Sequence, residues 1–178
     1  MLITNFENLE SELNEVVNEF GVYPEMRVDG ELKPGSLAVR VAIDDKTYSY
    51  EYAFNPENKL IEKRLKKRYA KLSLYKALSD FTGVKLPWGA LTGIRPSKLA
   101  VQQGENWRSF FTDEMLVSES KTKIIEDILS VQKPYYPKVG EDIFDFFVSL
   151  PFCPTRCAYC SFISCEISKE KAINEYIE

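Results

Sequence analysis

Apolar side chains recur at helical spacing near the start of the chain and then alternate with polar ones. The helical spacing predicts an amphipathic helix, whose apolar face comprises Phe6, Leu9, Leu13, Val16, Val17 and Phe20. Gly21 is a plausible C-terminal cap for this helix. After Pro34-Gly35, residues 37–43 alternate between apolar and polar positions, and a second strand-like segment covers residues 47–54. These patterns predict one helix followed by a β-hairpin.

Signals for the start and end of helices then recur up to residue 132. Asn55-Pro56 offers an N-cap and a first-turn proline for a long helix that ends at Gly83. Pro96 can start a short helix that ends near Gly104. A further helix has Ser118 as its candidate N-cap, and its expected buried stripe comprises Ile124, Ile125, Ile128 and Leu129.

Residues 86–96 differ in kind from these regular segments. They contain two prolines, two glycines and a tryptophan, which predicts a shaped loop rather than a helix or strand. Loops of this kind often carry function because a rigid scaffold positions them. Within it, Trp88 and Arg95 could contact a substrate or partner, or could equally hold the loop against the rest of the protein.

The last forty residues follow a different pattern. Residues 134–140 have the composition of a linker, and a near-continuous apolar run covers residues 143–150. Such a run is typical of a strand buried on both faces of a parallel sheet. A cysteine-rich loop follows at once, and residues 168–178 are rich in helix formers. This order predicts the first unit of a β/α barrel, in which reactive groups lie at the C-terminal ends of strands.

The overall composition changes this picture little, but the distribution of charge matters. Hydrophobic residues make up 44% of the chain and charged residues 28%, which is typical of globular proteins. A net charge of -4 gives no global reason to expect nucleic acid or an anionic membrane as the main partner. Acidic residues concentrate in residues 1–31 and basic residues in 59–71. The two segments could attract each other, or the basic run could be a solvated helix face or meet an anionic partner.

The lack of histidine limits the possible catalytic chemistry, and the lack of a signal peptide or membrane span bears on where the protein is located. The chain contains no histidine, which excludes Ser-His-Asp and Cys-His catalysis, histidine-bound zinc and histidine-ligated haem. It has no signal-peptide pattern and no stretch near the ~20 apolar residues needed to span a bilayer. We therefore expect a cytoplasmic protein without a membrane partner, in which carboxylates, Lys, Tyr or water transfer protons.

All four cysteines lie between Cys153 and Cys165, and the first 152 residues have none. A local cluster in a cytosolic protein indicates metal chemistry rather than a disulfide framework. Thiolates at Cys153, Cys157 and Cys160 can ligate three irons of a [4Fe-4S] cluster and leave the fourth open. An open iron can bind the amino and carboxylate groups of S-adenosylmethionine (SAM), which the reduced cluster cleaves to start radical chemistry. The alternative is a zinc site that also uses Cys165, which is otherwise a small buried residue.

The segment from Cys153 to Phe162 resembles the signature of radical SAM enzymes, three cysteines with an aromatic residue, Tyr159, before the last. Pro151-Phe152-Cys153 is similar to the corresponding segment of oxygen-independent coproporphyrinogen III oxidases. The segment 86–99, followed by the cysteine loop, looks most like the HemZ-type branch of that family; it reads Leu-Pro-Trp-Gly-Ala-Leu-Thr-Gly-Ile-Arg-Pro-Ser-Lys-Leu. The resemblance covers most of the chain from about residue 80. We expect an α+β N-terminal domain of helices and a β-hairpin over residues 1–138. Residues 139–178 would then be the first β/α unit of a truncated radical SAM barrel.

This family converts two propionate side chains of coproporphyrinogen III to vinyl groups, which gives protoporphyrinogen IX for haem synthesis. The resemblance implies a [4Fe-4S] cluster held by Cys153, Cys157 and Cys160. It implies SAM as the second cofactor, with Tyr159 beside its adenine and Phe147 where better-known members have a Tyr that contacts SAM. Ser149 falls where those members have a His. The implied partners are a tetrapyrrole substrate and a low-potential electron donor of the flavodoxin or ferredoxin type.

Several alternatives stay open at this point. Tyr159 could instead be a core aromatic residue, and Arg156 could offset the negative charge of the cluster or face solvent. The protein could bind or deliver haem while retaining the cluster loop, or residues 1–138 could be an RNA-binding or regulatory module that uses the basic helix. The family's glycine-rich second SAM-binding element is expected beyond residue 178. We therefore expect this chain alone to bind a cluster poorly and to lack a complete catalytic cycle.

Overall fold

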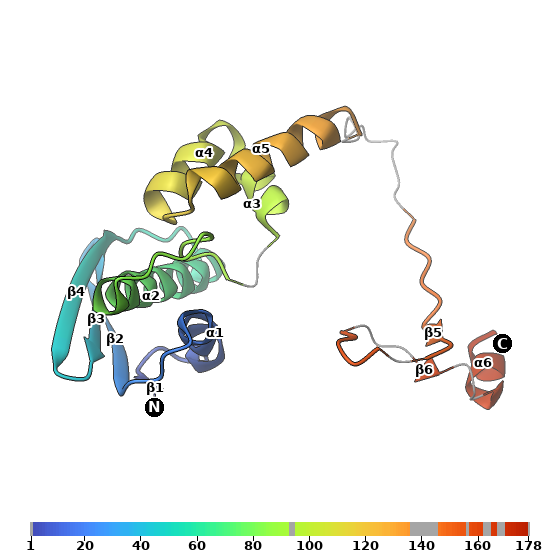
Figure 1. Cartoon of the computed structure of the whole chain (residues 1–178), viewed down its shortest axis with the longest axis horizontal. Coiled ribbons are helices and arrows are strands. Elements are labelled where there is room, and N and C mark those ends of the chain that lie inside the picture. Colours follow the sequence, from blue (N-terminus) through green and yellow to red (C-terminus); the bar gives the residue numbers. More distant parts are fainter. Residues whose placement is uncertain are drawn as a thin grey trace. The chain divides into compact units, whose positions relative to one another are not determined.

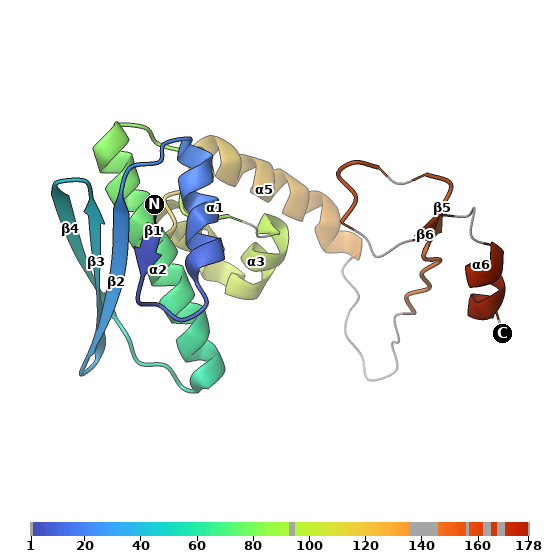
Figure 2. The same ribbon diagram turned by 90° about the horizontal axis from the view of Figure 1, so that it is seen from below.

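A mixed four-stranded sheet with the order β1-β2-β3-β4 is the framework of the N-terminal part of the chain. Its strands are β1 (Leu2–Thr4), β2 (Met26–Lys33), β3 (Ser36–Ile43) and β4 (Lys46–Ala53). β1 runs parallel to β2, while β2, β3 and β4 are antiparallel neighbours. Helices α1 (Glu10–Phe20) and α2 (Lys59–Thr82) lie side by side on one face of this sheet (Figures 1 and 2). The α+β class predicted for this part is therefore confirmed.

The structure is a computed structural model that describes residues 2–92, 95–135, 146–155, 157–161, 165–166 and 170–177. The chain divides into two compact units after Tyr135. The linker predicted over residues 134–140 lies largely outside the described residues, as does Arg156. The division into an accessory domain, residues 1–138, and a barrel domain, residues 139–178, stays a prediction.

The predicted hairpin is confirmed, but it is half of a larger sheet. The inward side of β3 is almost completely buried through Leu37, Val39, Val41 and Ile43. Asp44 makes the tight turn into β4 with a φ of 48°, a left-handed conformation that Asp tolerates better than most residues. The sequence did not predict β2, because its alternating apolar pattern is short. Only Met26 and Val28 are buried apolar residues on the inward side, and the next inward position is Gly30. A Cβ at Gly30 would collide with the Phe6 ring, so the glycine makes room for an aromatic residue from another segment.

Both helices on the sheet end where the sequence predicts, but α2 begins later than expected. Gly21 and Gly83 cap α1 and α2 in the left-handed conformation. The prediction that Asn55-Pro56 starts α2 is wrong, because the N-cap is Asn58. Its side-chain oxygen accepts hydrogen bonds from the backbone N–H groups of Leu60 and Ile61, both at 3.0 Å. This satisfies two amides that the first turn leaves without helical partners.

The acidic and basic segments attract each other inside the fold. Lys67 of α2 lies 2.9 Å from Glu12 of α1, and Lys71 lies 3.3 Å from Glu15. The Lys71 side chain is only 6% exposed, and burial lowers its pKa while the neighbouring Glu15 carboxylate opposes that shift. Lys67 and Lys71 of the basic run are therefore committed to contacts within this unit.

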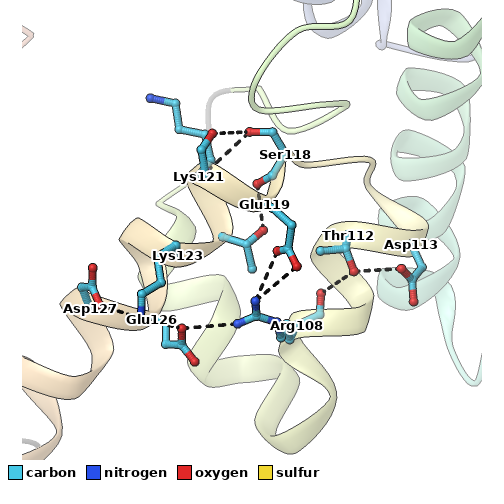
Figure 3. Close-up of polar contacts among 11 residues, drawn as sticks. Arg108, Thr112, Asp113, Ser118, Glu119, Lys121, Lys123, Glu126 and Asp127 are labelled. Carbon is cyan, nitrogen blue, oxygen red and sulfur yellow. Dashed lines mark hydrogen bonds and ion pairs between the residues drawn. The ribbon is translucent and has the colours of Figure 1, made fainter.

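Three further helical segments complete the N-terminal unit. They are α3 (Pro96–Gln103), the single turn α4 (Trp107–Ser109) and α5 (Glu119–Gln132), and Ser118 caps α5 as predicted. Arg108 ties α4 to α5 through Glu119 at 3.2 Å and Glu126 at 3.3 Å, as Figure 3 shows. Shorter turns are the 3-10 segments Gly104–Asn106 and Lys133–Tyr135 and the π turn Phe110–Glu114.

The predicted buried stripe of α5 is only partly right. Ile125 is buried, but Ile124 is 45% exposed and Ile128 is 40% exposed. The helix buries the narrower face that carries Thr122 and Ile125. These residues are three positions apart and so lie on one side of the helix, whereas Ile124 and Ile128 lie beside that side.

The C-terminal unit contains two short parallel strands and one helix. They are β5 (Phe152–Cys153), β6 (Cys165–Glu166) and α6 (Glu170–Ile177). The prediction of a buried strand is wrong for residues 146–150, where Phe146 and Phe147 are each 91% exposed and no strand forms. A strand of a parallel sheet is stabilised by neighbours on both sides. In the described part of this unit β6 alone pairs with β5, so the barrel unit is not confirmed.

None of the helices in the described part of the chain combines the length and the apolar character required to cross a membrane.

The ion pairs between α1 and α2 generate a prediction about stability. Glu15→Gln removes the only charge paired with the buried Lys71 ammonium in the described structure, whereas Glu12→Gln removes the partner of Lys67, which is 44% exposed. Because Glu15 is itself half exposed, we expect Glu15→Gln to lower the free energy of unfolding by about 1–3 kcal/mol, less than for a fully buried pair. Glu12→Gln should cost less than ~1 kcal/mol. Urea unfolding at neutral pH measures both, and equal losses would contradict the assignment.

Candidate functional site

The shaped loop is held between α2 and the segment that leads into α5. On one side, the Tyr75 hydroxyl donates to the carbonyl of Leu86 at 3.4 Å. On the other, the N–H of Ala90 donates to the carbonyl of Met115 at 2.9 Å, and the N–H of Ser118 donates to the carbonyl of Pro87 at 3.0 Å. The loop is therefore built into the N-terminal unit on both sides.

Gly89 is the residue that permits this close approach. Its φ of 57° lies in the left-handed region, and a Cβ there would collide with the carbonyl oxygen of Met115. Glycine is required on both counts, since it alone adopts this backbone conformation without strain and adds no side-chain atom. The glycine at position 89, part of the pattern that predicted a shaped loop, is therefore required by the close approach of the backbone to Met115.

Trp88 and Arg95 have different environments. Trp88 is half-buried and packs against the hydrophobic core, with the Lys121 ammonium 5.4 Å from its ring centroid. This contact supports the interpretation that Trp88 holds the loop. Arg95 is exposed at the N-cap position of α3, and its side chain does not cap that helix. It is accessible to a partner.

The shaped loop is also joined to the buried ion pair of Lys71 and Glu15. The sequence did not predict this link. Lys71 donates to the backbone carbonyl of Thr92 at 3.3 Å, and the Thr92 hydroxyl donates to the same Glu15 carboxylate oxygen at 3.2 Å. Thr92 therefore completes a polar cluster with Lys71 and Glu15. The attraction between the acidic and basic segments was visible in the sequence, but the part played by Thr92 was not.

The cysteine loop lies in the C-terminal unit and begins at β5. Cys153 and Cys160 are half-buried, and Cys157 is exposed. The N–H of Cys160 donates to the carbonyl of Cys157 at 3.1 Å, which closes a turn with Tyr159 at its tip. Tyr159 is 90% exposed, so the interpretation of this residue as a core aromatic is wrong.

The three cysteines are the right residue type to bind an iron-sulfur cluster, but in the part of the chain that the structure describes their side chains do not converge on one point. No disulfide joins Cys153, Cys157 and Cys160, so three thiols are present in one short loop. However, within the described ranges no three cysteine or carboxylate side chains are close enough together to hold one metal ion. Cys165 lies in β6 opposite Phe152 of β5. The cysteines therefore fit the group by chemistry, while their convergence on one centre is not seen.

Tyr176 fastens α6 to the segment before the cysteines, a contact that the sequence did not reveal. Its hydroxyl donates to the backbone carbonyl of Ser149 at 2.9 Å. Its ring packs edge-on against Phe152 with 5.4 Å between the centroids. Phe152 is adjacent to Cys153, so Tyr176 orients the point at which the cysteine loop begins. An aromatic residue on a helix of otherwise ordinary composition gave no signal for this role.

The chain thus combines an α+β unit with a three-cysteine loop followed by a helix. It is similar to the oxygen-independent coproporphyrinogen-III oxidase-like protein HemZ of Bacillus subtilis (strain 168), with 34% identity over 93 residues. The match covers 48% of this chain but only 19% of that protein's length. This confirms the resemblance to HemZ-type proteins that the motifs indicated. No protein-family model and no solved structure matches the chain.

The geometry of the shaped loop generates a prediction. Gly89→Ala should lower the free energy of unfolding by about 2–4 kcal/mol, because it combines left-handed strain with a backbone collision. Gly83→Ala is the matched control, since Gly83 has a φ of 74° but open space around it, and it should cost about 1–2 kcal/mol. Denaturant unfolding of both variants checks this. If the two substitutions were equally costly, the close packing of the loop on Met115 would be wrong.

Proposed function

We propose that this chain is the N-terminal part of a radical SAM oxidoreductase that acts on coproporphyrinogen III. The observation that carries the proposal is the spacing of Cys153, Cys157 and Cys160 in a chain homologous to HemZ. Three cysteines at x3 and x2 spacing suit a [4Fe-4S] cluster with one iron left for SAM. When bound, the cluster supplies the electron that cleaves SAM reductively.

The residues of this chain have distinct parts in the proposed site. The three thiolates hold the cluster, and Tyr159 is exposed between two of them, where it is accessible to the adenine of SAM. Phe147 contributes an apolar contact to the cofactor rather than a hydroxyl hydrogen bond. Tyr176 orients the strand that leads into the loop through its bond to Ser149. A low-potential donor of the flavodoxin or ferredoxin type supplies the electron, under the reducing conditions of the cytoplasm.

The proposed reaction is the oxygen-independent decarboxylation of two propionate side chains of coproporphyrinogen III to vinyl groups, which gives protoporphyrinogen IX in haem synthesis. The HemZ relationship supports this substrate class. Phe147 and Ser149 stand where better-known members of the family have Tyr and His, so the contacts to SAM must differ in detail. The second candidate function, haem binding or delivery, rests on this same departure.

The RNA-binding alternative loses support from the fold. Lys67 and Lys71 pair with carboxylates of α1, Lys66 pairs with Glu62 of its own helix, and the Arg68 guanidinium stacks over the Phe110 ring at 4.8 Å. These cations are used within the N-terminal unit. A nucleic-acid surface would need them free to neutralise phosphates.

Anaerobic reconstitution tests the proposal on the complete protein, meaning this chain with whatever natural sequence adjoins it. We expect close to four irons per chain and an EPR signal of the reduced cluster that changes when SAM is added. Alanine at Cys153, Cys157 or Cys160 should abolish most iron uptake. Cys165→Ala is the matched control and should retain it.

Two outcomes would overturn the proposed function. Uptake of zinc in place of iron, with loss of zinc in Cys165→Ala as well, would indicate a four-cysteine zinc site. A cluster whose EPR signal ignores SAM would remove the radical SAM assignment. Turnover of coproporphyrinogen III, measured by release of 5'-deoxyadenosine, then separates the dehydrogenase from a haem-binding protein.

A further inference from the structure

A groove of about 590 Å³ lies in the N-terminal unit, away from the cysteine loop in the sequence. One wall is the segment between β1 and α1, residues 5–9, and the other is the first two turns of α2. Gly30, Leu32 and Leu37 of the sheet lie between the walls. The volume falls in the range of ordinary small-molecule sites, about 300–1,000 Å³.

The first wall is held in place before any ligand binds. The Asn5 side chain accepts a hydrogen bond from the N–H of Gly30 at 2.8 Å and donates one to the carbonyl of Gly30 at 3.0 Å. The Phe6 ring fills the space that a side chain at position 30 would occupy. Fixed walls reduce the entropy lost on binding.

The second wall carries a row of cations. Lys59, Lys63 and Lys66 all line the groove and lie at positions i, i+4 and i+7 of α2. Residues at these intervals share one helix face, and the row is about 10 Å long at 1.5 Å per residue. These three lysines of α2 therefore lie in a row along the groove.

The charges of the groove do not cancel. Glu62 lies 2.6 Å from Lys66, so that pair is neutral. Glu7 is the other acidic residue in the lining. Lys59 and Lys63 are exposed, and neither forms an ion pair with any residue that the structure describes. The groove therefore has a net positive charge.

The remaining surface of the groove is apolar. Leu32 is 52% exposed although it is a large aliphatic residue, and it lies beside the buried Leu37, Leu9 and Phe6. A cationic row along one side and an apolar floor together suit a ligand that has an apolar body and negatively charged edges. A simple inorganic anion would leave Leu32 uncovered, and an uncharged lipid would leave the lysines without partners.

We propose that this groove binds an amphiphilic polycarboxylate, with its apolar body on Leu32 and its carboxylates on Lys59 and Lys63. Tetrapyrroles with propionate side chains are of this chemical class, so the choice of ligand rests on the proposed function. The groove is a second tetrapyrrole site that belongs to the accessory unit and is built from residues distant in sequence from the cluster loop. It holds substrate or product without taking part in the radical step.

Fluorescence titration of the complete protein, without its cluster, with coproporphyrin III tests this inference. The double variant Lys59→Glu/Lys63→Glu should bind at least about tenfold more weakly, since two charge-assisted contacts become repulsive. Arg64→Glu is the matched control, because it reverses an exposed charge on the same helix outside the groove lining, and it should bind within about twofold of the parent. The uncharged tetramethyl ester of the porphyrin should lose affinity to a similar extent as the double variant. Leu32→Asp should weaken binding through the apolar floor.

Circular dichroism establishes that each variant is folded, and Lys59→Gln/Lys63→Gln replaces the double variant if charge reversal disturbs α2. Equal weakening by Arg64→Glu, or equal binding of the ester and the acid, would overturn the inference. A protein that takes up a SAM-responsive cluster yet binds coproporphyrin III independently of Lys59 and Lys63 overturns the groove alone. A protein that holds the porphyrin through these lysines but takes up zinc overturns the proposed function alone.

Discussion

The buried ammonium of Lys71 is the constraint on which the arrangement of the N-terminal unit depends. A buried charge must be paired and hydrogen-bonded, since its desolvation is otherwise too costly. Here the partners come from two other segments, the carboxylate of Glu15 on α1 and the backbone carbonyl of Thr92 in the shaped loop. The same interaction therefore sets the register of α1 against α2 and fixes the end of the loop. The apolar core supplies most of the stability, but apolar contacts are non-directional and would tolerate several registers.

The shaped loop shows how the two ends of one segment are held by different means. Thr92 is held by charge, whereas Gly89 is held by a backbone approach so close that no side chain fits. Trp88 adds a half-buried ring under the Lys121 ammonium. Residues 86–92 are therefore held in the N-terminal unit at several points.

The cysteine loop, unlike the shaped loop, has few contacts within the described structure that hold it in place. Its three thiols are close in the sequence, between Cys153 and Cys160, but the apolar residues that precede it are not buried. Phe146 and Phe147 are almost fully exposed beside it, and only β6 pairs with β5 in the described residues. A near-continuous apolar segment gains its stability from layers on both faces.

The features that could be read from residue order alone depend on neighbouring residues. The caps at Gly21, Gly83 and Ser118, the alternation in β3, and the spacing of the cysteines are set by local sterics or by ligand geometry over a few positions. Features that needed the folded chain depend on distant residues. β2 exists because it pairs with β1 and β3 and accepts the Phe6 ring over Gly30, and Lys71 finds Glu15 across 56 positions. Burial of Ile125 rather than Ile124, and the groove lined by Lys59 and Lys63, likewise follow from which surfaces meet, because packing in three dimensions selects one face from several that the periodicity allows.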